Sequence, residues 1–127
     1  MLNYQVNGAR MKFLVRGKKG HWHRITFVQN SGQLFGSCAC PAGMRGEFCS
    51  HRYRLLKGRM SYLLSDNTDD VERLMGLIEG TEIEAAMTAL KAAEKMHKKS
   101  KEGRRAARAR FAKAIRPPAN DYKRKAG

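Results

Sequence analysis

Three cysteines and one histidine stand at a spacing that suits a metal ion. The chain of 127 residues has three cysteines, and all of them lie between residues 38 and 49. They read C-x-C, eight residues, then C-x-H, formed by Cys38, Cys40, Cys49 and His51. Three thiolates and one imidazole complete a tetrahedral shell for Zn²⁺ and leave no open position for a catalytic water. We therefore expect a structural Zn²⁺ whose binding energy is largely folding energy.

There are three alternatives to this metal site: a disulfide, a different histidine as fourth ligand, and free cysteines. A disulfide would leave one cysteine over, and Cys38 and Cys40 are too close in sequence for an unstrained bridge. His21 and His23 are spare imidazoles, so either is an alternative to His51 as the fourth ligand. The remaining alternative is a set of free or buried cysteines with an incidental histidine. Chance rarely spaces every cysteine of a chain as a metal ligand, so the metal site is favoured.

The same pattern resembles the SWIM zinc finger, over about residues 1–64. The resemblance implies a small β-meander followed by a helix, with Cys38 and Cys40 at a strand end and Cys49 and His51 at the helix start. It also implies a role in binding DNA or protein rather than in catalysis. The family often has an apolar residue directly after the histidine, where this chain has Arg52. That departure concerns the packing of the helix and not the metal.

Alternation of apolar and polar residues predicts four short strands that lead to the cysteines. The strands cover residues 2–6, 9–16, 21–28 and 33–38. Asn7-Gly8 is a strong hairpin signal, and Gly-rich loops separate the other strands, so we expect an antiparallel meander. A helix from Ser50 to about Leu64 should lie on this sheet with Tyr53, Leu56, Met60, Leu63 and Leu64 on one stripe. A sheet this small buries little area, so stabilisation by a metal is physically expected.

The rest of the chain is predicted to be helical. A helix over 69–79 ends at Gly80, and a capping box at Thr81 starts a last helix from Glu82 to about Ile115. The short loop favours an antiparallel hairpin between these two helices. From Lys95 onwards the last helix is nearly all Lys, Arg and Ala, with Gly103 as a candidate break. This part has too little apolar surface to dock firmly and is expected to order on nucleic acid.

The predicted fold class is α+β, a small antiparallel β-meander plus helix around a structural zinc, followed by a C-terminal helical extension with a basic tail. Three domains are expected: a SWIM-like zinc-binding ββββα module over 1–65, an acidic helical hairpin over 66–94, and a basic Ala/Lys/Arg-rich helix and tail over 95–127.

Net charge is the second strong signal. The chain carries 26 Lys and Arg against 11 Asp and Glu, a net charge of +15, with the acids concentrated in residues 66–90. Such an excess favours a polyanionic partner, most often nucleic acid. A membrane partner is not expected, because there is no apolar run near 18 residues and no broad apolar face beside the basic segment. Zinc thiolates and the lack of a signal peptide favour a reducing cytoplasmic or nucleoid/nuclear location over secretion.

We therefore expect a small zinc-stabilised nucleic-acid-binding protein, with DNA favoured over RNA. Its phosphate contacts would come from a basic zinc-finger face and a basic C-terminal arm. The alternative for these charges is plain solvation, and Trp22 either stacks a base among them or packs in the core. The candidate contacts are Arg10, Lys12, Arg16, Lys18, Lys19, Arg24, Arg52, Arg54, Lys57, Arg59, Lys98, Lys99, Arg104, Arg105, Arg108 and Arg110.

A protein-interaction adaptor is the alternative function. The helices at 69–94 would offer an apolar stripe around Met75 and Met87 to a partner, as in a phage or mobile-element protein that acts on a host nucleic-acid enzyme. Neither an enzymatic activity nor a small-molecule substrate is expected. The chain has no Ser/His/Asp set, no P-loop and no Gly-rich dinucleotide turn.

Overall fold

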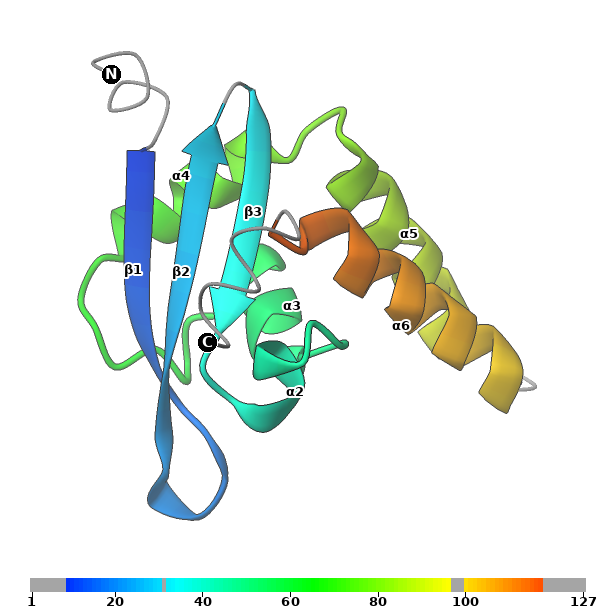
Figure 1. Cartoon of the computed structure of the whole chain (residues 1–127), viewed down its shortest axis with the longest axis horizontal. Helices are drawn as coiled ribbons and strands as arrows, with labels where there is room; N and C mark the ends of the chain where they lie inside the picture. Colours follow the sequence, from blue (N-terminus) through cyan, green and yellow to red (C-terminus); the bar gives the residue numbers. More distant parts are fainter. Residues whose placement is uncertain (1–8, 31, 97–99, 118–127) are drawn as a thin grey trace.

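The chain folds around a three-stranded antiparallel sheet. The computed structural model describes residues 9–30, 32–96 and 100–117. Strands β1 (Ala9–Arg16), β2 (Trp22–Asn30) and β3 (Gln33–Cys38) are paired in the order β1-β2-β3 (Figure 1). The expected α+β class and three strands of the meander are confirmed. The first expected strand, over 2–6, and its turn at Asn7-Gly8 lie outside the described residues.

One face of the sheet is buried and the other is open. Met11, Phe13 and Val15 of β1, with Ile25 and Phe27 of β2, are at most 2% exposed. The intervening residues occupy the opposite face because side chains alternate along a strand. The alternation in the sequence therefore predicts correctly which side of these two strands faces the core.

Five helices and one 3-10 turn accompany the sheet in the described ranges. They are η1 (Lys18–Gly20), α2 (Pro41–Met44), α3 (Ser50–Leu56), α4 (Thr68–Leu77), α5 (Glu82–Lys95) and α6 (Lys101–Ile115). Helix α4 lies behind the sheet, while α3 and α6 contact β3 (Figure 1). None of these described helices is long and apolar enough to cross a membrane.

Helix α3 ends at Leu56, so the expected helix to Leu64 is wrong. Gly58 has a φ of +83°, a left-handed conformation that favours glycine. Its N–H donates to the carbonyl of Leu55 over 2.9 Å, and the N–H of Arg59 donates to that of Arg54 over 3.0 Å. These two bonds form a Schellman motif, which turns the chain out of the helix.

The residues beyond this turn run along the free edge of β1. Arg16 donates its N–H to Tyr62 O over 2.8 Å, and Leu64 donates to Leu14 O over 2.7 Å. The N–H of Leu14 donates to Ser65 Oγ over 3.1 Å, and Asn67 Nδ2 donates to Lys12 O over 2.8 Å. Residues 62–67 therefore cover the strand edge instead of continuing the helix.

The expected last helix is two helices, and its partner differs from the expected one. Met96 has extended backbone angles and ends α5, and the Ser100 side chain then caps α6 by accepting the N–H of Gly103 over 3.0 Å. Gly103 thus lies in the first turn of α6 and does not interrupt the helix. Helix α5 forms its hairpin with α6 rather than with α4.

Helix α6 docks firmly, against expectation. Phe111 and Ile115 are fully buried, and Ala112 is 2% exposed. The Phe111 ring lies 5.3 Å from the ring of Tyr53 and 6.0 Å from that of Phe48, between centroids. Two large apolar residues on one face of α6 are enough because they enter an aromatic cluster. Buried residues of all three predicted domain ranges join one core.

The Schellman turn gives a stability test. Gly58→Ala should lower the free energy of unfolding by about 1–2 kcal/mol, because alanine is strained at positive φ. Its Cβ would also lie 2.8 Å from Met75 Sδ. Gly76→Ala is the matched control, since Gly76 lies in α4 with open space around its Cβ position, and it should raise stability by about 0.5–1 kcal/mol. Urea denaturation measures both. Equal changes of the same sign would contradict the role of Gly58.

Candidate metal centre and basic surfaces

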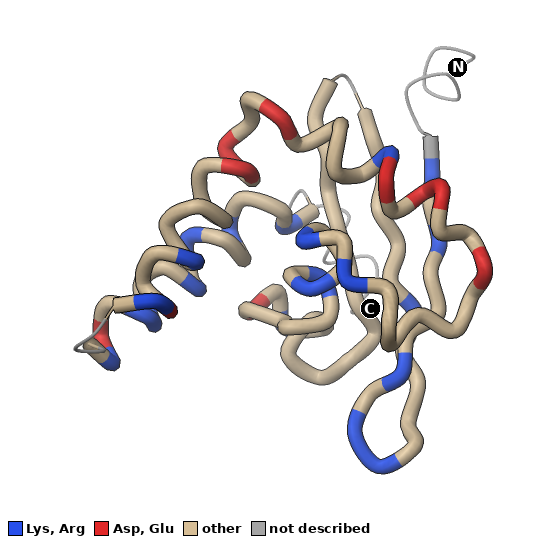
Figure 2. The backbone as a smooth tube through the Cα atoms, turned by 180° about the vertical axis from the view of Figure 1, so that it is seen from behind, with Lys and Arg blue, Asp and Glu red and all other residues tan. Residues whose placement is uncertain are grey.

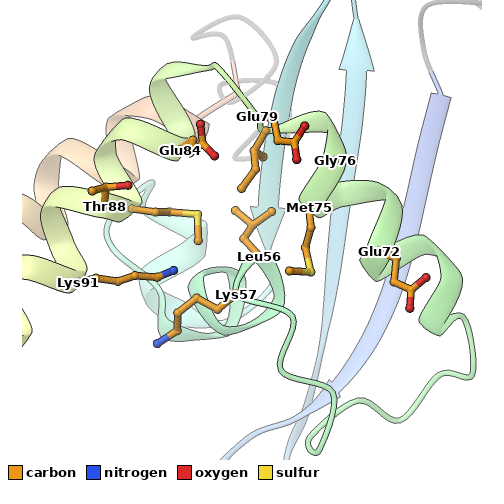
Figure 3. Close-up of a pocket in the computed structure, with 11 residues that line it drawn as sticks. Leu56, Lys57, Glu72, Met75, Gly76, Glu79, Glu84, Thr88 and Lys91 are labelled. Atoms are coloured by element: carbon orange, nitrogen blue, oxygen red, sulfur yellow. The ribbon is translucent and has the colours of Figure 1, made fainter.

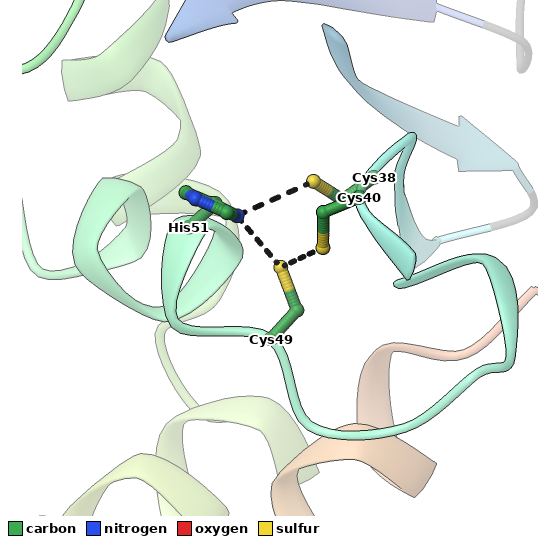
Figure 4. Close-up of side chains that lie close together, drawn as sticks. All are labelled: Cys38, Cys40, Cys49 and His51. Carbon is green, nitrogen blue, oxygen red and sulfur yellow. Dashed lines mark hydrogen bonds between the residues drawn. The ribbon is translucent and has the colours of Figure 1, made fainter. Parts of the chain in front are cut away.

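Four side chains from three elements converge on one point. Cys38 ends β3, Cys40 and Cys49 precede α2 and α3, and His51 lies in the first turn of α3 (Figure 4). Their ligand atoms all lie within 4.8 Å of one another. Cys40 Sγ is 3.4 Å from Cys49 Sγ, and His51 Nδ1 is 3.5 Å from Cys49 Sγ and 3.8 Å from Cys38 Sγ. A tetrahedral ion with bonds of about 2.0–2.3 Å separates its ligands by similar distances. The expected four-ligand cluster is therefore confirmed as a site that can hold a metal ion.

The loop between the two ligand pairs is held in place by its own backbone. Pro41 begins α2, and Cys40 Sγ accepts the N–H of Gly43 over 3.3 Å. A Cβ at Gly43 would lie 2.5 Å from the carbonyl oxygen of Cys38. Glycine is thus needed for the close approach that folds the loop back over the first ligand.

The sulfur atoms are buried in surroundings that stabilise negative charge at one of them. Cys38, Cys40 and Cys49 are at most 5% exposed. The pKa of Cys49 is lowered to about 3, first by the hydrogen bond with Cys38, then by His51 and by the backbone N–H and charge of Arg52. The pKa of Cys40 is raised, mainly by burial. A cation at the centre would favour the thiolate form of all three.

The fourth position is filled by His51 and not by the alternative histidines. Neither His21 nor His23 belongs to the cluster. The ring of His23 instead lies 4.7 Å from that of His51 between centroids. Burial, followed by the charge of His51, lowers the pKa of His23. His23 therefore lies beside the ligand and is not one of the four ligands.

The expected contact of Arg52 with phosphate at the surface is wrong, because the side chain is buried. It is 1% exposed, and its guanidinium donates to Gly36 O over 2.9 Å and to Glu47 O over 2.6 Å. These bonds join β3 to the loop that precedes Cys49. Arg52 thus fills, with a buried charge, the position after the histidine where the SWIM family often has an apolar residue. A centre of three thiolates and Zn²⁺ carries one net negative charge, which this guanidinium can balance.

Most other candidate contacts in the first half of the chain are exposed. On the open sheet face these are Arg10, Lys12, Arg16 and Arg24, and Lys18 and Lys19 lie in the η1 turn. Trp22 is 55% exposed and so does not pack in the core. It pairs with Arg16 across the strands, and the Arg24 guanidinium lies 5.8 Å from its ring centroid. Sheet pairing therefore gathers cations around an exposed aromatic ring.

The candidate phosphate contacts on and near the helices differ in exposure and in ion pairing. Arg54 and Arg59 are exposed, while Lys57 is half-buried with its ammonium 4.3 Å from the Tyr53 ring centroid. Lys98 and Lys99 lie outside the described residues. On α6, Arg110 is bound by both oxygens of Glu82, over 2.8 and 3.1 Å.

The three remaining arginines, Arg104, Arg105 and Arg108, line a groove on the other side of α6. Most acids of the described residues lie on α4, on the loop that follows it and at the start of α5 (Figure 2), whereas Glu47 lines this groove and Glu102 lies in the first turn of α6.

A second groove separates α4 from α5. It has a volume of about 560 Å³, with Leu56, Met75 and Met87 among its apolar lining residues (Figure 3). Met75 is 41% exposed, whereas Met87 is 4% exposed. Glu72, Glu79 and Glu84 lie along the same groove. The expected apolar stripe is therefore only partly open, and the lysines Lys57 and Lys91 line the groove together with these acids.

Comparison of the chain with protein-family models, with curated proteins and with solved structures gives no match. The resemblance to the SWIM family thus rests on the four spaced ligands. Their convergence in space supports a metal centre independently of that resemblance.

Replacement of Arg52 tests its structural role. Arg52→Met keeps the length of the side chain but removes its charge and its donors to two backbone carbonyls. We expect the free energy of unfolding to fall by about 2–4 kcal/mol. Arg59→Met is the control, because Arg59 is exposed and its loss should change stability by less than about 0.5 kcal/mol. Equal stability of the two variants in chemical denaturation would refute the structural role.

Proposed function

We propose that this protein is a small nucleic-acid-binding module stabilised by one structural Zn²⁺. The observation that carries the proposal is the position of the four-ligand cluster at the end of a sheet whose open face presents exposed arginines and Trp22. Three cysteines and one histidine suit zinc, and four protein ligands suit a structural rather than a catalytic ion. The net charge of +15 supports a polyanionic partner.

The sheet is a rigid platform in this proposal. Arg16 and Trp22 face each other across β1 and β2, and Leu14 faces Arg24 in the next pair. Zinc binding fixes the end of β3 and the start of α3, so it holds the sheet against the helices. Cations on such a platform bind phosphates without reading sequence, and the exposed indole can stack on a base. The proposed affinity therefore comes mainly from counterion release.

The metal is tested by removal and by paired histidine variants. Elemental analysis should give one zinc per chain, and a strong chelator should lower the melting temperature and reduce the far-UV circular dichroism, because metal binding is coupled to folding. His51→Ala should lose the metal, whereas His23→Ala should keep it, since His23 lies outside the cluster. A folded protein without stoichiometric metal would disprove the zinc centre.

The interface is tested by the salt dependence of binding to a random-sequence duplex. About six phosphate contacts predict a slope near −5 in a plot of log K against log salt. The double variant Arg16→Ala with Arg24→Ala should make this slope shallower by about 2. Lys91→Ala with Lys95→Ala on α5 is the control, because it removes the same number of positive charges. It should change the slope less. Binding should also quench the fluorescence of Trp22, the single tryptophan. A slope near zero would refute the proposal.

A protein-interaction function is the second candidate. The groove between α4 and α5 favours it, because exposed Met75 lies beside Glu72, Glu79 and Glu84. A partner segment with an apolar anchor and flanking charges of both signs would fit this surface, because Lys57 and Lys91 also line the groove. Gel shift with random DNA and RNA, beside light scattering of mixtures, separates the two candidates. Failure to bind either nucleic acid at low salt would favour the adaptor.

A further inference from the structure

A groove runs between α6 and the loop that leads to Cys49. It has a volume of about 500 Å³ and is lined by Glu47, Phe48, Lys101, Arg104, Arg105, Arg108, Ala109, Ala112 and Arg116. Arg116 donates from Nη2 to Gly46 O over 3.0 Å and so ties the loop to the end of α6. Five of the nine lining residues are cationic. This bond holds the loop before Cys49 against α6, and the groove between them is lined mostly by cations.

The cations of this groove are poorly balanced within the described residues. Glu47 is the single acid among the lining residues, and its carboxylate lies 3.1 Å from Arg45. Arg104 Nε is buried and has no hydrogen-bond partner among the described residues. Like charges also repeat four residues apart along α6, which disfavours the helix until an anion lies between them. Arg110, by contrast, is outside the groove and already paired with Glu82.

An aromatic ring lies in the same groove. Phe48 packs against Tyr53 and Phe111, with centroids 5.8 and 6.0 Å away, so the core fixes the position of its ring. The guanidinium of exposed Arg108 lies 5.0 Å from the Phe48 ring centroid. A nucleobase could stack on this pair or take the place of the guanidinium over the ring.

We propose that this groove binds one or two nucleotides of a single strand, with phosphates on Lys101, Arg104 and Arg105 and a base on Phe48 and Arg108. This inference rests on the proposed nucleic-acid-binding function and gives it a second, distinct site. A positive groove with an aromatic platform is the combination that single-strand binders use. The groove has the volume of a small-ligand site, so a strand with unpaired bases fits it better than a duplex. DNA and RNA share the required phosphodiester and base.

The test compares two variants of equal charge. Arg105→Glu with Arg108→Glu alters the groove, whereas Lys95→Glu with Lys113→Glu places the same change on exposed positions of α5 and α6 outside it. Anisotropy of labelled 12-nucleotide DNA and RNA strands, and of the matching duplex, is measured at one salt concentration. The groove variant should weaken single-strand binding at least tenfold more than the control. Phe48→Leu should weaken it about fivefold or more and leave duplex binding nearly unchanged.

The possible results separate this inference from the function on which it rests. Equal losses in the two double variants, with wild-type binding intact, would overturn the groove site and leave the nucleic-acid function standing. Equal effects of Phe48→Leu on strand and duplex, with an unchanged melting temperature, would overturn the stacking role. If Phe48→Leu unfolds, the comparison of the two charge variants decides whether the groove binds a single strand. A wild-type protein that binds none of the three probes would end both proposals.

Discussion

The convergence of Cys38, Cys40, Cys49 and His51 is the constraint on which the other features depend. These four residues join the end of β3, the α2 loop and the start of α3. Arg52 strengthens the junction from inside, because it bonds to β3 and to the loop before Cys49. Tyr62 adds a third link, since its hydroxyl donates to the carbonyl of His51. The segment that covers β1 is thereby tied to the same centre.

Charge in this protein is segregated by structure as well as by sequence. Many acids lie on α4, on the loop after it and at the start of α5, where Glu82 binds Arg110 (Figure 2). The cations of the open sheet face lie elsewhere, and the cations of the α6 groove have Glu47 as the one acid among the lining residues. One arginine that looks like a surface cation is buried, and another is neutralised by an ion pair. Among the described residues, the basic surfaces around Trp22 and around Phe48 each carry an aromatic ring. A formal charge of +15 therefore overstates what each surface offers to a ligand.

The sequence could predict the parts that follow from local spacing. The ligand set depends on residue type and separation, and the faces of β1 and β2 depend on alternation, so both were predictable. The end of α3 was visible as Gly58, but a single glycine weakens a helix without showing that the chain will turn. Burial of Arg52 depends on carbonyls of Gly36 and Glu47, which are distant in sequence. The docking of α6 likewise depends on an aromatic pocket that Phe48 and Tyr53 build, so composition alone predicted a loose segment.

The segment over 62–67 also affects how copies of this chain can meet. A bare outer strand offers its amide and carbonyl groups to the strand of another molecule, which is a common route to aggregation. Tyr62, Ser65 and Asn67 already occupy those groups from Lys12 to Arg16. Intermolecular sheet extension is therefore blocked along this stretch of β1. In a concentrated solution, residues 62–67 would hinder edge-to-edge pairing of β1 between molecules, in addition to the mutual repulsion of their positive charges.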